Sequence, residues 1–184
     1  MLRAVLIVLF VLISCSPSAA DEEMAPYPYV VTTDGRFYFE MTPDPEAKYD
    51  HDKGYGTLFE INNDGTEKVL WKVDGWYAFK TYISHDGKYL VRMGNWPRGH
   101  EPSDEHLAIA FYKEGKLLKS YSTKDLIKDP SAIRPTVSHY FFLKKVIGFE
   151  EPYNYRFIMQ TIDNVEYVFD ASNGMIVSRK NLQK

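Results

Sequence analysis

Short runs of alternating apolar and polar side chains cover most of the sequence that follows its first apolar stretch. The clearest series begins at Ser84, where a Ser-His-Asp-Gly turn precedes a run at 88–93. A polar loop then leads to a run at 107–112, and Glu-Gly-Lys leads to a run at 117–121. A period of two residues is typical of strands with one buried face. The pattern therefore predicts a strand, a loop, a strand, a tight turn and a third strand.

Looser copies of this unit lie before and after it, at separations of about 50 residues. The segment 167–177 matches the hairpin of the central unit. The other corresponding turn positions are Asp34-Gly35 with Asp86-Gly87, Gly65 with Gly115, and Ser84-His85 with Ser138-His139. About three copies therefore make up one all-β domain, which we place at residues 28–184.

The phrases Ser-His-Asp-Gly-Lys-Tyr-Leu-Val at 84–91 and Tyr-Val-Phe-Asp-Ala-Ser-Asn-Gly at 167–174 resemble β-propeller blades of the TolB-like and WD-like kind. The resemblance implies an antiparallel meander of about three propeller-blade-like repeats. Closed propellers have four to eight blades, so this one would be small or incomplete. A β-sandwich or a curved sheet is the alternative. The open sheet edges would be covered by extra strands at 27–33 and 76–83, or by self-association.

A single short helix is expected among the strands. It is predicted at 123–128, with Thr123 as the N-cap and Asp129-Pro130 as the stop. The last third of the chain favours strands at 136–146, 156–162, 165–170 and 175–179.

The first twenty residues have the layout of a secretory signal peptide. Arg3 supplies a positive charge, 4–13 is apolar, and 16–20 is small and polar. The apolar run is shorter than the roughly 20 residues of a membrane-spanning helix. We therefore expect an exported protein, which is periplasmic, lipid-anchored in the envelope, or secreted.

Two processing sites remain open. Cleavage after Ala20 would remove residues 1–20, whereas Leu-Ile-Ser-Cys15 resembles the lipobox of bacterial lipoproteins. The second resemblance implies a signal of residues 1–14 and lipidation at Cys15, which would be the only contact with a membrane. In the first case residues 21–27 form a linker to the domain.

Composition excludes several classes of protein. Cys15 is the only cysteine, so neither an intrachain disulfide nor a multi-thiolate zinc site exists. A net charge of −3 argues against nucleic-acid binding, which needs a basic surface. No phosphate-binding glycine motif or nucleophile elbow occurs. Neighbouring residues on a strand point to opposite faces, so Ser84-His85 and Ser138-His139 are interpreted as turn residues rather than as catalytic pairs.

Three loops carry the remaining chemistry, at 43–53, 96–106 and 149–155, and the repeat predicts that they lie on one edge. Aromatic and charged residues there suit ligand recognition. The candidate ligand-binding residues are Trp96, Arg98, His100 and Tyr153. The candidate ligands of a divalent metal are His51, Asp52, His100, Asp104 and His106.

The leading interpretation is a non-enzymatic envelope protein that binds another protein or a surface glycan and needs no cofactor. The alternative is a metal- or carboxylate-dependent hydrolase that uses the His-rich and acidic loops.

Overall fold

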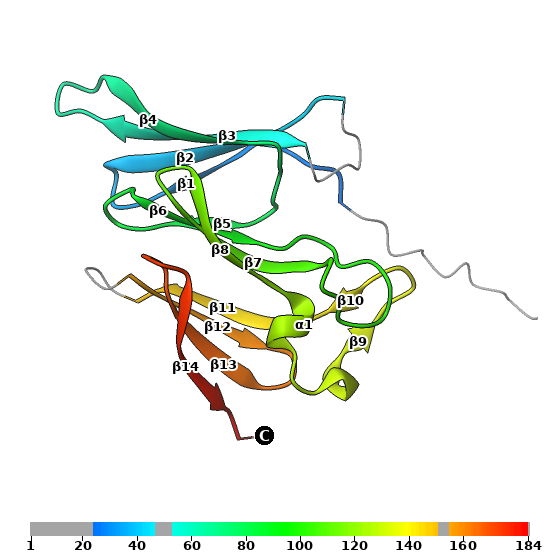
Figure 1. Cartoon of the computed structure of the whole chain (residues 1–184). Coiled ribbons are helices and arrows are strands. Elements are labelled where there is room, and N and C mark those ends of the chain that lie inside the picture. The colour runs from blue at the N-terminus through cyan, green and yellow to red at the C-terminus, as the bar shows by residue number, and fades with distance from the viewer. Residues whose placement is uncertain (1–23, 47–52, 151–154, 184) are drawn as a thin grey trace, which may run out of the picture.

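The computed structural model describes residues 24–46, 53–150 and 155–183. Three four-stranded antiparallel sheets follow one another along the chain, and the strands of each sheet pair in chain order (Figure 1). The first sheet comprises β1 (Tyr29–Thr32), β2 (Phe37–Pro43), β3 (Gly54–Ile61) and β4 (Glu67–Asp74). The second comprises β5 (Thr81–Ile83), β6 (Tyr89–Met93), β7 (Leu107–Lys113) and β8 (Lys116–Ser122). The third comprises β11 (Leu143–Phe149), β12 (Arg156–Thr161), β13 (Val165–Asp170) and β14 (Met175–Asn181).

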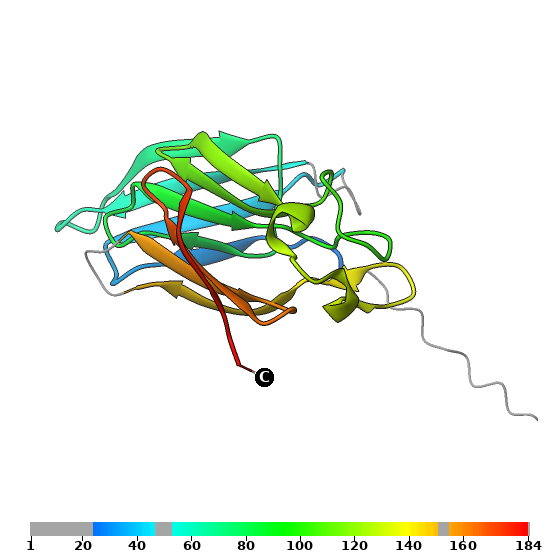
Figure 2. The same cartoon turned by 60° about the horizontal axis from the view of Figure 1, so that its bottom comes forward.

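A helical connection joins the second sheet to the third. It comprises helix α1 (Thr123–Leu126), the 3-10 turn η1 (Pro130–Ala132), and the two-stranded ribbon of β9 (Arg134–Pro135) and β10 (Tyr140–Phe141). The two views show these elements gathered at one end of the strands (Figures 1 and 2). Among the described residues, no helix has the length and hydropathy needed to cross a membrane.

Strands β6 and β7 of the second sheet are buried on both faces, whereas β8 is mostly exposed. Leu90 and Tyr112 pack against the first sheet, while Val91 and Phe111 pack against the third. Alternate residues of β6 and β7 therefore serve two separate hydrophobic cores, as the period of two requires. The predicted all-β fold with three propeller-like repeats is confirmed, and the arrangement has three stacked sheets where a sandwich has two.

Glycine turns join each sheet to the one before it. A Cβ atom at Gly115 would collide with the backbone of Lys72 on β4, and one at Gly174 would lie 2.6 Å from Cβ of Lys119 on β8. Both glycines have positive φ, +80° and +74°. Glycine therefore allows the last hairpin of one sheet to sit directly on the outer strand of the preceding sheet.

Each sheet has one strand more than the predicted unit, because β1, β5 and β11 add a first strand. The region 76–83 was predicted as a strand, but only its last three residues pair, as β5. Trp76 and Tyr77 leave the sheet and are buried in the core between the first and second sheets. The predicted strand at 136–146 is likewise divided between β10 and the beginning of β11.

The helix begins one residue earlier than its predicted cap implies. Ser122, not Thr123, is the N-cap: its hydroxyl accepts from Asp125 N–H, and the Asp125 carboxylate accepts from Ser122 N–H. The Thr123 hydroxyl lies 2.6 Å from the hydroxyl of Tyr140, so it serves tertiary packing instead. The helix ends at Leu126, and Asp129 caps the following 3-10 turn.

Candidate functional site

The loops divide between two edges of the stack. We call the edge that carries the β2–β3, β6–β7 and β12–β13 connections the loop edge, and the opposite one, with β1–β2, β5–β6 and β11–β12, the turn edge. The loops at 43–53 and 96–106 belong to the loop edge, but 149–155 joins β11 to β12 and belongs to the turn edge. The prediction that all three share one edge was wrong, because the third repeat was aligned one strand out of step.

Contacts along the turn edge confirm this assignment. His85 Nδ1 lies 3.3 Å from the Asp34 carboxylate, which joins the β1–β2 and β5–β6 turns. The Tyr155 hydroxyl donates to Asp86 Oδ2 at 2.9 Å, which joins the β5–β6 and β11–β12 connections. The described residues of the β11–β12 connection, Glu150 and Tyr155, therefore lie at the opposite end of the strands from His100 and Asp104.

The β6–β7 loop is fixed to the β9–β10 ribbon by main-chain hydrogen bonds. Gly99 N–H donates to Ser138 O at 3.0 Å, and Tyr140 N–H donates to Pro97 O at 3.2 Å. Arg98 and His139 form an antiparallel bridge between the two segments. This pairing holds the beginning of a long loop in a defined shape, although loops of this length are often irregular.

A pocket of about 290 Å³ opens between this loop, the end of β6 and the beginning of the third sheet. Its lining is mostly aromatic and aliphatic. The residues that line it are Met24, Phe79, Lys80, Met93, Gly94, Asn95, Trp96, Pro97, His139, Tyr140, Phe141, Phe142 and Leu143. Its size and apolar character are those of a small-ligand or side-chain pocket.

Neighbouring rings form one part of its wall. The Trp96 ring lies 3.9 Å from the His139 ring, and the His139 ring contacts Phe141 edge-on at 5.0 Å. Phe141 is 50 % exposed, so a ring that is in contact with the pocket also faces solvent. Such rings present large apolar surfaces with few rotatable bonds, which favours binding.

Two polar side chains of the pocket, Asn95 and His139, make hydrogen bonds within the fold. Asn95 donates from Nδ2 to Tyr77 O at 2.9 Å and accepts at Oδ1 from Phe79 N–H at 3.0 Å. His139 Nδ1 lies 2.7 Å from the Thr136 hydroxyl. These groups fix the shape of the walls, and the pocket therefore offers mainly dispersion and hydrophobic contact.

The structure separates the predicted ligand-binding residues. Trp96 lines the pocket, whereas Arg98 and His100 are exposed outside its lining, and Tyr153 lies outside the described residues. Phe79, His139 and Phe141 were missed by the sequence prediction. The pair Phe141-Phe142 gave a signal, because two successive aromatic residues place a ring on each face of a strand, and on a strand with one solvent face one ring is exposed.

The predicted metal ligands do not converge where the structure describes them. Asp104 accepts from Lys124 Nζ at 2.6 Å, His106 Nδ1 lies 2.9 Å from the Tyr140 hydroxyl, and His100 is exposed. No three His, Cys, Asp or Glu side chains in the described ranges are grouped to hold a metal ion. His51 and Asp52 lie outside those ranges.

His106 belongs instead to a network that packs helix α1 against the β9–β10 ribbon. The Tyr140 hydroxyl lies within hydrogen-bond distance of both His106 and Thr123, and the Thr123 hydroxyl donates to Ser103 O at 3.2 Å. Burial raises the pKa of Tyr140. The network supports one wall of the pocket.

The two Ser-His pairs are structural. The Ser84 hydroxyl donates to Asp86 Oδ1 at 2.7 Å and accepts from Tyr89 N–H at 3.0 Å, as expected of a turn residue. Ser138-His139 was predicted to correspond to Ser84-His85, but it lies between β9 and β10, ahead of the third sheet. The correspondence failed because the β9–β10 segment is an insertion between repeats.

Comparisons with known proteins assign no family. No family model and no curated protein sequence matches the chain. Among solved structures, the C-terminal WD40 domain of Sif2 is similar with a TM-score of 0.39 and 11% sequence identity. The match covers 88% of this chain and 40% of that one, so this chain spans less than half of the WD40 structure. The propeller-like description rests on the three stacked meanders themselves.

Proposed function

We propose that this protein is an exported, non-enzymatic binding module of the cell envelope, and that the loop-edge pocket takes up an apolar side chain of a partner protein. The observation that carries the proposal is the aromatic pocket itself. It is held open by main-chain pairing between the β6–β7 loop and the β9–β10 ribbon. Recognition groups on loops fixed to a rigid sheet are a common basis for binding.

The chemistry of the lining favours a protein over a surface glycan as the partner. Sugar rings carry many hydroxyls, and a buried hydroxyl without a hydrogen-bond partner costs free energy. The amide of Asn95 is already occupied within the fold, and the rest of the lining is mainly apolar. An aromatic or aliphatic side chain has no hydrogen bonds with water to give up there, and its burial removes apolar surface from water.

Export is proposed from the first twenty residues, which lie outside the described ranges. A domain that depends on no disulfide suits a reducing or an oxidising compartment equally. The sequence support is therefore the charged, apolar and small-residue order of the leader, together with the lipobox-like Leu-Ile-Ser-Cys15.

The proposal is tested by protecting Trp96 from a quencher. Trp71 and Trp76 are buried, so acrylamide quenching reports mainly on Trp96. N-acetyl-phenylalaninamide should reduce this quenching saturably, and N-acetylglucosamine should not. A Trp96→Ala variant should lose the response, while Tyr55→Ala, an exposed aromatic residue on the first sheet, should keep it. Protection by the sugar alone would reassign the partner to a glycan, and protection by neither probe would contradict a binding pocket.

A further inference from the structure

The two ends of the stack expose different faces. The two central strands of the third sheet carry polar and charged pairs on their outer face: Gln160 Nε2 donates to Glu166 Oε2 at 2.9 Å, and Arg156 pairs in register with Asp170. These pairs flank the small cross-strand pair of Ile158 and Val168. The flanking strands β11 and β14 also expose apolar side chains, among them Ile147 and Met175. Polar pairs of this kind help to solvate the outer face of a terminal repeat.

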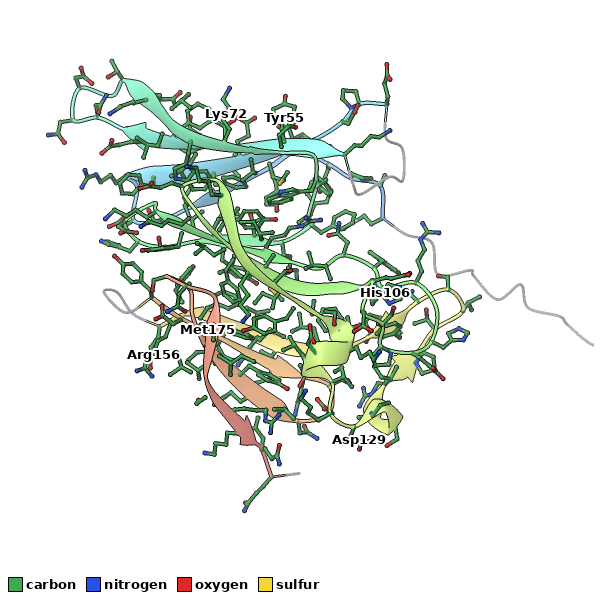
Figure 3. The ribbon with its side chains drawn as sticks, in the orientation of Figure 1. Tyr55, Lys72, His106, Asp129, Arg156 and Met175 are labelled. Atoms are coloured by element: carbon green, nitrogen blue, oxygen red, sulfur yellow. The ribbon has the colours of Figure 1, made fainter. Side chains whose placement is uncertain are left out.

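The outer face of the first sheet presents aromatic and apolar side chains. The Tyr38 and Phe59 rings stack at 4.8 Å with an angle of 11° between their planes. Val69, which pairs with Phe59, is 48 % exposed, and Val30, on the β1 side, is 55 % exposed. Figure 3 places Tyr55 and Lys72 on this side, away from the other two sheets. No described segment packs on this face.

Two side chains of opposite charge, Glu40 and Lys72, lie in the same cross-strand row of this face. Glu40 on β2 pairs in register with Thr57 on β3, and Thr57 pairs with Lys72 on β4. A second copy related by a two-fold axis along β3 would present its β4 side to the β2 side of the first. Glu40 of each copy would then lie opposite Lys72 of the other. The neighbouring row would place Phe59 opposite its own counterpart and Tyr38 opposite Val69.

We propose that the outer face of the first sheet is a homodimer interface, in which two copies pack face to face about a two-fold axis along β3. The interface is isologous, because the same patch serves both copies. The sheets pack aligned, as in β-sandwiches. With the axis along β3, strands β2, β3 and β4 of the two copies overlap, and three strands of this length span a flat area of about 350 Å², from the usual rise and strand spacing. That is small for a stable complex, so the dimer dissociates at micromolar concentrations.

Charge reversal tests both the surface and its symmetry. Sedimentation velocity of the purified protein from about 10 µM to 1 mM should show a reversible dimer. Glu40→Lys and Lys72→Glu should each weaken it at least about tenfold, because each variant places two like charges opposite one another. An equimolar mixture of the two variants should dimerise again, since every pair is then of opposite charge. The matched control is Glu166→Lys on the third sheet, which should leave the dimer unchanged.

A protein that stays monomeric up to 1 mM would overturn the interface. A wild-type dimer that both variants leave intact, or a mixture that stays monomeric, would overturn the proposed two-fold arrangement. Circular dichroism of each variant checks that it is folded. Because the loop-edge pocket lies away from this face, the Trp96 quenching response should persist in Glu40→Lys, so a failure here is distinguishable from a failure of the proposed function.

Discussion

The contact between Asp86 and Tyr155 joins the second and third sheets at the turn edge, 69 positions apart in sequence. The Tyr155 hydroxyl donates to Asp86 Oδ2 at 2.9 Å. The same carboxylate accepts from the Ser84 hydroxyl at 2.7 Å and from Lys88 N–H at 3.2 Å. Substituting Asp86 therefore measures how much one charged acceptor contributes to the free energy of unfolding.

The expected effect follows from three hydrogen bonds to a partly buried carboxylate. A hydrogen bond to a charged group contributes a net of about 1.5 to 3 kcal/mol, less where water has access. Tyr155→Phe should lower the free energy of unfolding by about 1 to 2 kcal/mol, and Asp86→Ala by about 2 to 4 kcal/mol. Urea unfolding of both variants and of the double variant forms a double-mutant cycle. The two losses should be non-additive by about 1 kcal/mol.

The pH dependence provides a second readout with a defined sign. Partial burial alone would raise the pKa of Asp86, but hydrogen bonds from Ser84, Tyr155 and Lys88 lower it below the ordinary 3.8. A carboxyl with a lowered folded pKa stabilises the protein above its unfolded pKa, and this contribution is lost as the pH falls through the folded pKa. Wild type should therefore lose more stability below pH 4 than Asp86→Ala does. Additive losses in the cycle together with identical acid profiles would refute the reasoning.

Three further predictions follow from single features. Gly174→Ala should lower the stability in thermal unfolding by about 1 to 3 kcal/mol more than Gly35→Ala does. Both glycines have positive φ, but only Gly174 is in close contact with the second sheet. Equal losses would exclude close packing at Gly174. Ser122→Ala should cost about 1 kcal/mol through loss of the helix cap, with an unchanged stability arguing against the capping box. Intact-mass analysis of the exported protein should give either an acylated Cys15 or an unmodified Asp21 as the first residue, and an uncleaved chain would contradict export.

The repeat was predictable because it depends on local sequence. Turn residues such as Asp86-Gly87 and Gly115 act within a few positions, and alternation of side chains defines each strand. The span of β13 at Val165–Asp170 was predicted to the residue. The third repeat was aligned wrongly because the ribbon of β9 and β10 is an insertion. Spacing in sequence then no longer measures position in the stack.

The site was predicted only in part for a related reason. Trp96 was found because a tryptophan in a polar loop is conspicuous. In the sequence, its neighbour Phe79 precedes the second sheet and its neighbour His139 follows it. Only tertiary packing brings both residues to Trp96. The prediction that the loop at 149–155 shares this edge was wrong. Its composition resembles that of the other two loops, but it joins different strands of its sheet. Composition identifies the residue types, whereas strand order determines which of them meet.

The most direct test of the proposed function is an NMR titration of the isotopically labelled protein with p-cresol, which resembles a tyrosine side chain. The proposed function predicts saturable amide shifts that cluster at Phe79, Asn95, Trp96, His139 and Phe141, on both sides of the pocket. The same titration of Trp96→Ala should give markedly smaller shifts. Shifts spread over the surface, or confined to the outer face of the first sheet, would contradict a binding pocket at the loop edge.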